Sequence, residues 1–95
     1  MTKIENKITE DSKEKKIEEL IELGKFYFVN ERYDEAIRNF KKAVKIDKNN
    51  AEIYYNLGIV YESKKLFMKA DQMYTKALEL NPDHELAKKH VYGKN

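Results

Sequence analysis

The chain repeats itself at a spacing of 34 residues, and this repeat constrains its fold more than any other feature. Residues 17–50 align with residues 51–84 without a gap. Most of the identical positions hold small or apolar residues, which set how helices pack. The identical pairs are Glu18/Glu52, Leu23/Leu57, Gly24/Gly58, Tyr27/Tyr61, Ala36/Ala70, Lys42/Lys76 and Ala43/Ala77. A period of this length is typical of supersecondary units stacked side by side.

Each unit has the pattern of two amphipathic helices joined by a short turn. Apolar residues recur every three or four positions in both halves of a unit, which predicts one apolar face per helix. Polar segments at 30–32, 47–50 and 63–65 separate the helices, and Pro82 follows the last one. We expect the side chain of Asn50 to cap the next helix. With only 3 Gly and 1 Pro in 95 residues, the chain lacks the turn residues of an all-β fold.

Gly24 and Gly58 occupy the same position in the first helix of each unit. Glycine inside a helix costs about 1 kcal/mol relative to alanine, so a compensating contact is expected there. We predict that the second helix of each unit approaches closely at the glycine. The alanines of that helix are expected to face the glycine and are Ala36 and Ala43 in the first unit and Ala70 and Ala77 in the second. Aromatic residues such as Tyr33 and Phe67 are expected to fill the wider gaps between helices.

The two units resemble the tetratricopeptide repeat family, over 68 of the 95 residues. The residues that carry the resemblance are Leu20-x-x-Leu23-Gly24-x-x-Tyr27 with Ala36-x-x-x-Phe40-x-x-Ala43, and Tyr54-x-x-Leu57-Gly58-x-x-Tyr61 with Ala70-x-x-x-Tyr74-x-x-Ala77. The chain departs from the family pattern at Leu20, where Trp is usual, and at Lys48, where Pro is usual. The resemblance implies an all-α fold of antiparallel helix–turn–helix hairpins, with about five helices in a right-handed superhelical stack.

The repeat divides the chain into four segments. Residues 1–11 hold only Ile4 and Ile8 as sizeable internal apolar residues. Their spacing of four leaves a weak helix open, but a disordered N-terminal tail is the expectation. Repeat 1 spans residues 12–50 and repeat 2 spans residues 51–84. Residues 85–95 hold a short amphipathic helix and a tail, and this helix is expected to cap the exposed edge of repeat 2.

The resemblance also implies where a partner binds, because proteins of this family hold peptides in the concave groove lined by the first helix of each unit. Side chains expected to face this groove follow helical spacing and lie apart from the core residues. An apolar strip between charges suits an extended or helical peptide. The candidate groove residues are Ile21, Glu22, Lys25, Phe28, Val29, Glu52, Tyr55, Asn56, Ile59, Glu62, Lys89 and His90, with Glu18 at the start of the row.

Two other functions stay open at this point. Two units are fewer than the three that a stable repeat array usually needs, so the chain is also a candidate for a homodimer formed through a repeat edge or the terminal helix. RNA binding through Lys41, Lys42, Lys45 and Lys48 is the weaker alternative, because 19 basic residues are nearly balanced by 17 acidic ones.

Composition and motifs argue against other classes of function. The chain has no Cys, no glycine-rich phosphate loop and no nucleophile motif, so we expect neither an enzyme nor a cofactor. His84 and His90 are six residues apart, which is the wrong helical spacing for a metal pair, and we expect one or both to be exposed to solvent. No apolar run reaches the length of a membrane span. We expect a cytoplasmic adaptor whose partner is another protein or peptide.

Overall fold

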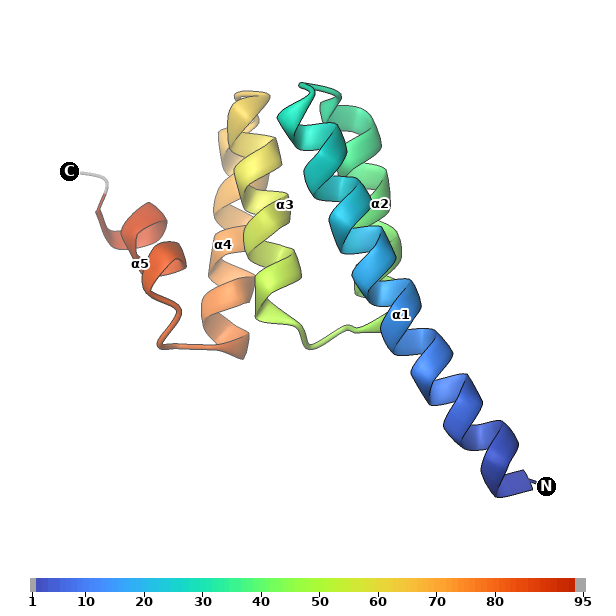
Figure 1. Ribbon diagram of the computed structural model, residues 1–95. Helices are drawn as coiled ribbons and strands as arrows, with labels where there is room; N and C mark the ends of the chain where they lie inside the picture. The colour runs from blue at the N-terminus through green and yellow to red at the C-terminus, as the bar shows by residue number, and fades with distance from the viewer. Residues whose placement is uncertain (1, 94–95) are drawn as a thin grey trace.

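The computed structural model describes the backbone of residues 2–93 and the side chains of residues 11–93. Five helices follow one another with no strand in this part of the chain. They pair into two antiparallel hairpins that stand side by side, with a last helix beyond them (Figure 1). The helices are α1 (Thr2–Val29), α2 (Tyr33–Ile46), α3 (Ala51–Ser63), α4 (Phe67–Leu80) and α5 (Glu85–Tyr92). The all-α hairpin fold expected from the repeat is therefore confirmed.

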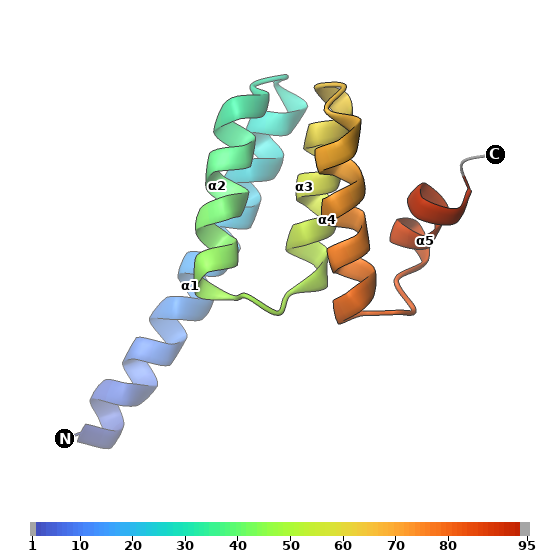
Figure 2. The ribbon, with the colours of Figure 1, turned by 180° about the vertical axis from the view of Figure 1, so that it is seen from behind.

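The tail expected at residues 1–11 is wrong for the described residues, because α1 begins at Thr2 and not after residue 11. Met1 lies outside the described residues. The segment 2–23 contains neither Gly nor Pro and is rich in Lys and Glu, which are good helix formers, so nothing in it breaks the helix. As a result, the first turns of α1 project beyond the body of the molecule (Figures 1 and 2).

The turns and caps repeat along with the sequence. Asn50 caps α3 as expected, since its Oδ1 accepts hydrogen bonds from the backbone N–H of Glu52 at 3.0 Å and of Ile53 at 3.4 Å. Glu31 and Lys65 lie 34 residues apart in the two hairpin turns, and both have a left-handed backbone, with φ of 61° and 62°. The two units therefore agree down to single backbone torsions.

Both glycines lie under aromatic rings. A Cβ added to Gly24 would come within 2.5 Å of Phe40 Cε1, and a Cβ added to Gly58 would come equally close to Tyr74 Cε1. The predicted close approach is confirmed, but the prediction that alanines face the glycines is wrong. Each glycine makes room for a fully buried ring, and Phe40 and Tyr74 are the largest of the fully buried side chains.

Equivalent residues differ in exposure where only one unit has a neighbour before it. Leu57 and Val60 are 2% and 1% exposed in the joint between the hairpins, whereas the equivalent Leu23 and Phe26 are 44% and 60% exposed. Leu23 was expected in the core. It lies on the outer edge of the first hairpin, which nothing covers in the described structure. Phe67 was expected to fill a gap and is also exposed, at 55%.

The two hairpins are also linked by charge. Lys64, after α3, pairs with Asp34 at the start of α2, and its hydrogen bond and positive charge lower the pKa of Asp34.

None of the described helices combines the length and apolar character that crossing a lipid bilayer requires.

Candidate functional site: the inner face of the hairpins

The first helix of each hairpin lies on one side of the molecule and the second helix on the other. Figure 1 shows α1 and α3 in front of α2 and α4, and Figure 2 shows the reverse. We call the side formed by α1 and α3 the inner face. The side chains assigned to it are Glu18, Ile21, Glu22, Lys25, Phe28, Glu52, Tyr55, Asn56, Ile59 and Glu62.

Four of the predicted groove residues meet around one small cavity between α1 and α3. The cavity has a volume of about 80 Å³. Its floor is formed by core side chains that the sequence reasoning did not place there. It is lined by Lys25, Phe28, Phe40, Asn56, Ile59 and Val60. The cavity is therefore lined by residues of α1, α2 and α3, whereas the predicted groove residues around it come from α1 and α3 alone.

Asn56 is the chemically distinctive residue of this cavity. Its side-chain nitrogen Nδ2 is buried and has no hydrogen-bond partner within the described part of the chain. A buried donor without a partner costs about 1–3 kcal/mol, so native proteins rarely leave one. The lining of the cavity thus combines this unpartnered amide with the apolar side chains of Phe28 and Ile59 and with Lys25.

A second cluster lies where α3 meets α5, and its polar groups are paired. The Tyr74 hydroxyl donates to Glu62 Oε1 at 2.6 Å, and His90 Nδ1 lies 3.1 Å from the same oxygen. The imidazole of His90 also stacks on the Tyr74 ring at 4.3 Å between centroids. The Tyr55 ring lies 5.8 Å from His90, which closes the cluster.

The environment of this cluster favours protonated tyrosines. Burial raises the pKa of Tyr74, and the hydrogen bond to Glu62 and its negative charge raise it further. The pKa of Tyr55 is raised by burial first and then by the charges of Glu52 and Glu62. Both phenols therefore stay neutral at physiological pH, and Tyr74 acts as a hydrogen-bond donor.

His84 fixes the start of α5. Its Nδ1 accepts from the backbone N–H of Ala87 at 3.2 Å, so the proton must be on Nε2, which lies 2.9 Å from Glu52 Oε2. The cap therefore requires a neutral imidazole. One or both histidines were expected to be exposed, and this is wrong. The His84 side chain is only 9% exposed and that of His90 27%, because both dock α5 on α3.

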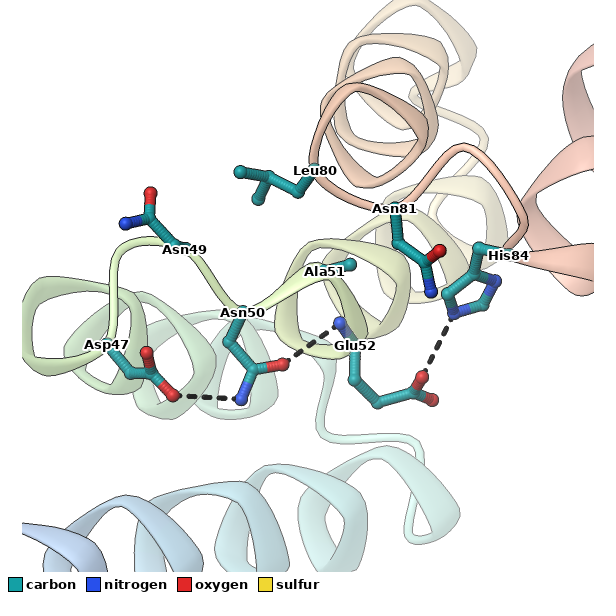
Figure 3. Close-up of a pocket in the computed structure, with 8 residues that line it drawn as sticks. All are labelled: Asp47, Asn49, Asn50, Ala51, Glu52, Leu80, Asn81 and His84. Atoms are coloured by element: carbon teal, nitrogen blue, oxygen red, sulfur yellow. Dashed lines mark hydrogen bonds and ion pairs between the residues drawn. The ribbon is translucent and has the colours of Figure 1, made fainter.

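The polar hollow shown in Figure 3 is a structural joint, despite its size of about 440 Å³. Asn50 Nδ2 donates to Asp47 Oδ2 at 3.0 Å, and its Oδ1 caps α3. Glu52 holds His84 on the other side of the hollow. These groups satisfy one another, and no set of three or more His, Cys, Asp or Glu suited to a metal occurs among the described residues.

The remaining predicted groove residues lie apart from the cavity. Ile21 packs against the core, Glu22 is exposed on α1, and Val29 is 77% exposed at the end of α1. Lys89 is exposed on α5. The sequence reasoning missed the role of Tyr74 beside Glu62. The repeat alignment contains a signal for this pair. Tyr74 aligns with Phe40 and Glu62 aligns with Phe28, so two apolar positions of the first unit are both polar in the second.

Comparison with known proteins gives one family twice. The model described as "TPR repeat" matches residues 24–65, and the model described as "Tetratricopeptide repeat" matches residues 51–84. The chain is 37% identical over 76 residues to mitochondrial import receptor subunit TOM70 of Saccharomyces cerevisiae (strain ATCC 204508 / S288c), which covers 80% of the chain and 12% of TOM70. It is 45% identical over 49 residues to protein O-mannosyl-transferase TMTC3 of Homo sapiens, over 50% of the chain and 5% of that protein.

The fold also matches a solved structure. The crystal structure of MamA superposes with a TM-score of 0.77 at 28% identity, over 79% of this chain and 44% of that one. The chain thus spans only a small part of the curated relatives it matches. What they share with it is the repeat, a fold that in general mediates interactions and does not catalyse reactions. The chain belongs to the tetratricopeptide repeat family and is a protein–protein interaction module.

Proposed function

We propose that the inner face binds a peptide or an exposed segment of another protein at the cavity between α1 and α3. The observation that carries this proposal is the unpartnered Nδ2 of Asn56 in a cavity otherwise lined mostly by apolar side chains. A ligand that brings a carbonyl oxygen to this donor removes a desolvation cost that the free protein bears.

The surroundings of Asn56 support a peptide over a small molecule. The cavity of about 80 Å³ is too small for a drug-sized ligand, which needs several hundred Å³, but it accepts one apolar side chain. Phe28 and Ile59 provide the apolar contact on either side of the amide. An anchor side chain together with a backbone hydrogen bond is a common way for a groove to hold a peptide.

The proposal is tested by selection from a displayed library of random twelve-residue peptides against the full chain. Peptides enriched on the unaltered chain are expected to lose at least about tenfold in affinity for Asn56→Ala/Ile59→Ala, as expected for losing one buried hydrogen bond and one apolar contact. The matched control is Lys41→Ala/Lys45→Ala, on the exposed side of α2, which should bind as before. Peptides that bind all three chains equally would contradict the groove.

Self-association is a second candidate, supported by the outer edge of α1. Leu23 and Phe26 are largely exposed there, while their equivalents Leu57 and Val60 are buried in the second hairpin, which has a neighbouring hairpin before it. A second copy that covers this edge would bury the same kind of surface. Sedimentation equilibrium over a hundredfold concentration range tests it. A dimer mass that disappears in Leu23→Gln/Phe26→Gln supports it, and a monomer mass throughout rejects it.

A further inference from the structure

Charge is sorted between the two sides of the molecule, although the whole chain carries a net charge of only +2. Helix α3 contains Glu52 and Glu62 and no Lys or Arg. Helix α2, on the opposite side, contains Arg38, Lys41, Lys42 and Lys45 against two acidic residues. Of the ten side chains assigned to the inner face, four are carboxylates, including Glu18 and Glu22 of α1, and one, Lys25, is a cation. The face that holds the cavity is therefore acidic.

Of the four carboxylates assigned to the inner face, the two on α1, Glu18 and Glu22, are the ones available to a partner. Glu52 and Glu62 lie beside His84 and His90, whereas Glu18 and Glu22 are exposed and form no ion pair with any described residue. They are one helical turn apart and therefore point the same way. Glu22 is one turn before Lys25, which lines the cavity, so these carboxylates continue along α1 from the cavity toward the start of the helix.

The repeat itself shows what such a carboxylate can hold. Glu18 and Glu52 are equivalent positions, and Glu52 accepts the Nε2–H of His84 from the helix that packs next to it. The residue equivalent to His84 in the first unit is Asn50, which caps α3 and pairs with Asp47. Glu18 is therefore left without the nitrogen donor that its counterpart has.

We propose that the segment recognised by the inner face is a cationic amphipathic peptide. This inference rests on the proposed function and names the chemistry of its partner. Lysine or arginine side chains of the peptide pair with Glu18 and Glu22, and an apolar side chain enters the cavity between Phe28 and Ile59. An acceptor on the peptide takes the hydrogen bond of Asn56 Nδ2.

Charge complementarity decides against an acidic ligand. A peptide with carboxylates at these positions would be repelled by the exposed carboxylates of Glu18 and Glu22, which outnumber Lys25 among the residues assigned to this part of the inner face. Each exposed ion pair contributes about 0.2–1 kcal/mol, so two of them give a preference of roughly twofold to thirtyfold for a basic over a neutral peptide. The preference must shrink as salt is added, since the Debye length falls from about 10 Å at 0.1 M salt to about 3 Å at 1 M.

The test uses the peptides enriched from the random library and compares three versions of the tightest one. In these versions the basic residues are kept, replaced by Gln, or replaced by Glu. Binding to the full chain is measured by fluorescence anisotropy at 0.05 M and 0.5 M salt. The expected order is basic, then neutral, then acidic, with the difference reduced at high salt. Glu18→Gln/Glu22→Gln should abolish the order, and Lys41→Gln/Lys45→Gln should preserve it.

The outcomes separate this inference from the function on which it rests. Enriched peptides that are neutral or acidic, or an order that survives Glu18→Gln/Glu22→Gln, would overturn the cationic partner and leave the groove standing. Failure to enrich any peptide above the Asn56→Ala/Ile59→Ala background would overturn both. Circular dichroism of each variant, with unchanged helix content, excludes loss of fold as the cause.

Discussion

The junction between α1 and α3 and the junction between α3 and α5 use equivalent positions of the repeat, but the side chains at those positions differ in polarity. Where α1 meets α3, the contact is mainly apolar and contains a cavity. Where α3 meets α5, the same positions hold groups that pair with one another. The equivalent residues, first junction before second, are Phe28 and Glu62, Phe40 and Tyr74, Asn56 and His90, and Ile21 and Tyr55.

The two junctions differ in whether their polar groups find partners within the chain. Glu62 accepts from Tyr74 and lies beside His90, so the second junction is satisfied within the chain. Phe28 stands where that carboxylate would be in the first junction and offers no acceptor to Asn56, whose Nδ2 stays unpartnered. The last junction thus stabilises the docking of α5, whereas the first keeps an unpartnered donor, which is the basis of the proposed binding site.

The largest expected effect comes from the contact that both junctions share. Gly58→Leu forces a side chain into the Tyr74 ring, and Gly24→Leu does the same to Phe40. Overpacking of this kind costs about 1–3 kcal/mol or more in the free energy of unfolding. Urea unfolding followed by circular dichroism measures the loss. The exposed change Lys42→Leu is the control, and a cost no larger than that control would mean that the rings move aside freely.

Glu62→Phe makes the second junction resemble the first. It leaves the buried Tyr74 hydroxyl without its acceptor, which should cost about 1–3 kcal/mol of stability. Adding Tyr74→Phe removes the stranded hydroxyl, so the double variant should be no less stable than Glu62→Phe alone. The double-mutant cycle is read by urea unfolding. Additive losses would show that Glu62 and Tyr74 do not act as a pair.

Tyr74→Phe alone should cost about 1–2 kcal/mol and change the response to alkali. Because the pKa of Tyr74 is raised in the folded state, its contribution is fully present below the unfolded value near 10 and is lost as the pH rises above it. Thermal unfolding between pH 8 and 11 should therefore fall less steeply for Tyr74→Phe. Parallel curves for the two proteins would contradict the assignment.

The smallest effect, of opposite sign, is expected at the first junction. Asn56→Leu replaces an unpartnered donor by an apolar side chain of similar size and should stabilise the protein by up to about 1 kcal/mol. The same change should weaken peptide binding by up to about tenfold, because it removes the proposed hydrogen-bond donor. Thermal unfolding and anisotropy titration read the two results separately. A variant that is destabilised by more than 1 kcal/mol would show that Asn56 supports the fold itself.

The sequence predicted the hairpins well because the same small and apolar residues occur at equivalent positions in both units, so each unit supports the interpretation of the other. Gly24 and Gly58, together with the cap at Asn50, were identifiable from spacing and residue type. The N-terminal extension of α1 was missed because residues 2–11 hold only two sizeable apolar residues, Ile4 and Ile8, which are too few to establish a helical period. Exposure of Leu23 was missed because a repeat pattern shows which surfaces can be buried, but not whether a neighbour is present to bury them.

The candidate site was only partly predictable for a similar reason. Helical spacing places Lys25 and Phe28 on one face, and the repeat adds Asn56 and Ile59 beside them. Spacing does not show that Asn56 lacks a partner, since that depends on Phe28 lying where Glu62 lies in the next unit. Nor does it show His84 acting as a cap, because histidine seldom has that role and needs the neutral ring to do so.

The projecting start of α1 has a practical consequence for any measurement of size. At 1.5 Å per residue, its 28 residues reach about 42 Å, and the molecule measures 57 × 30 × 16 Å. Its radius of gyration is 14.8 Å, whereas a compact chain of this length is expected near 12 Å. A single copy will therefore elute from a sizing column ahead of spherical standards of equal mass. Elution volume would overstate the mass of a single copy, so a method that weighs the particle is needed to count its copies.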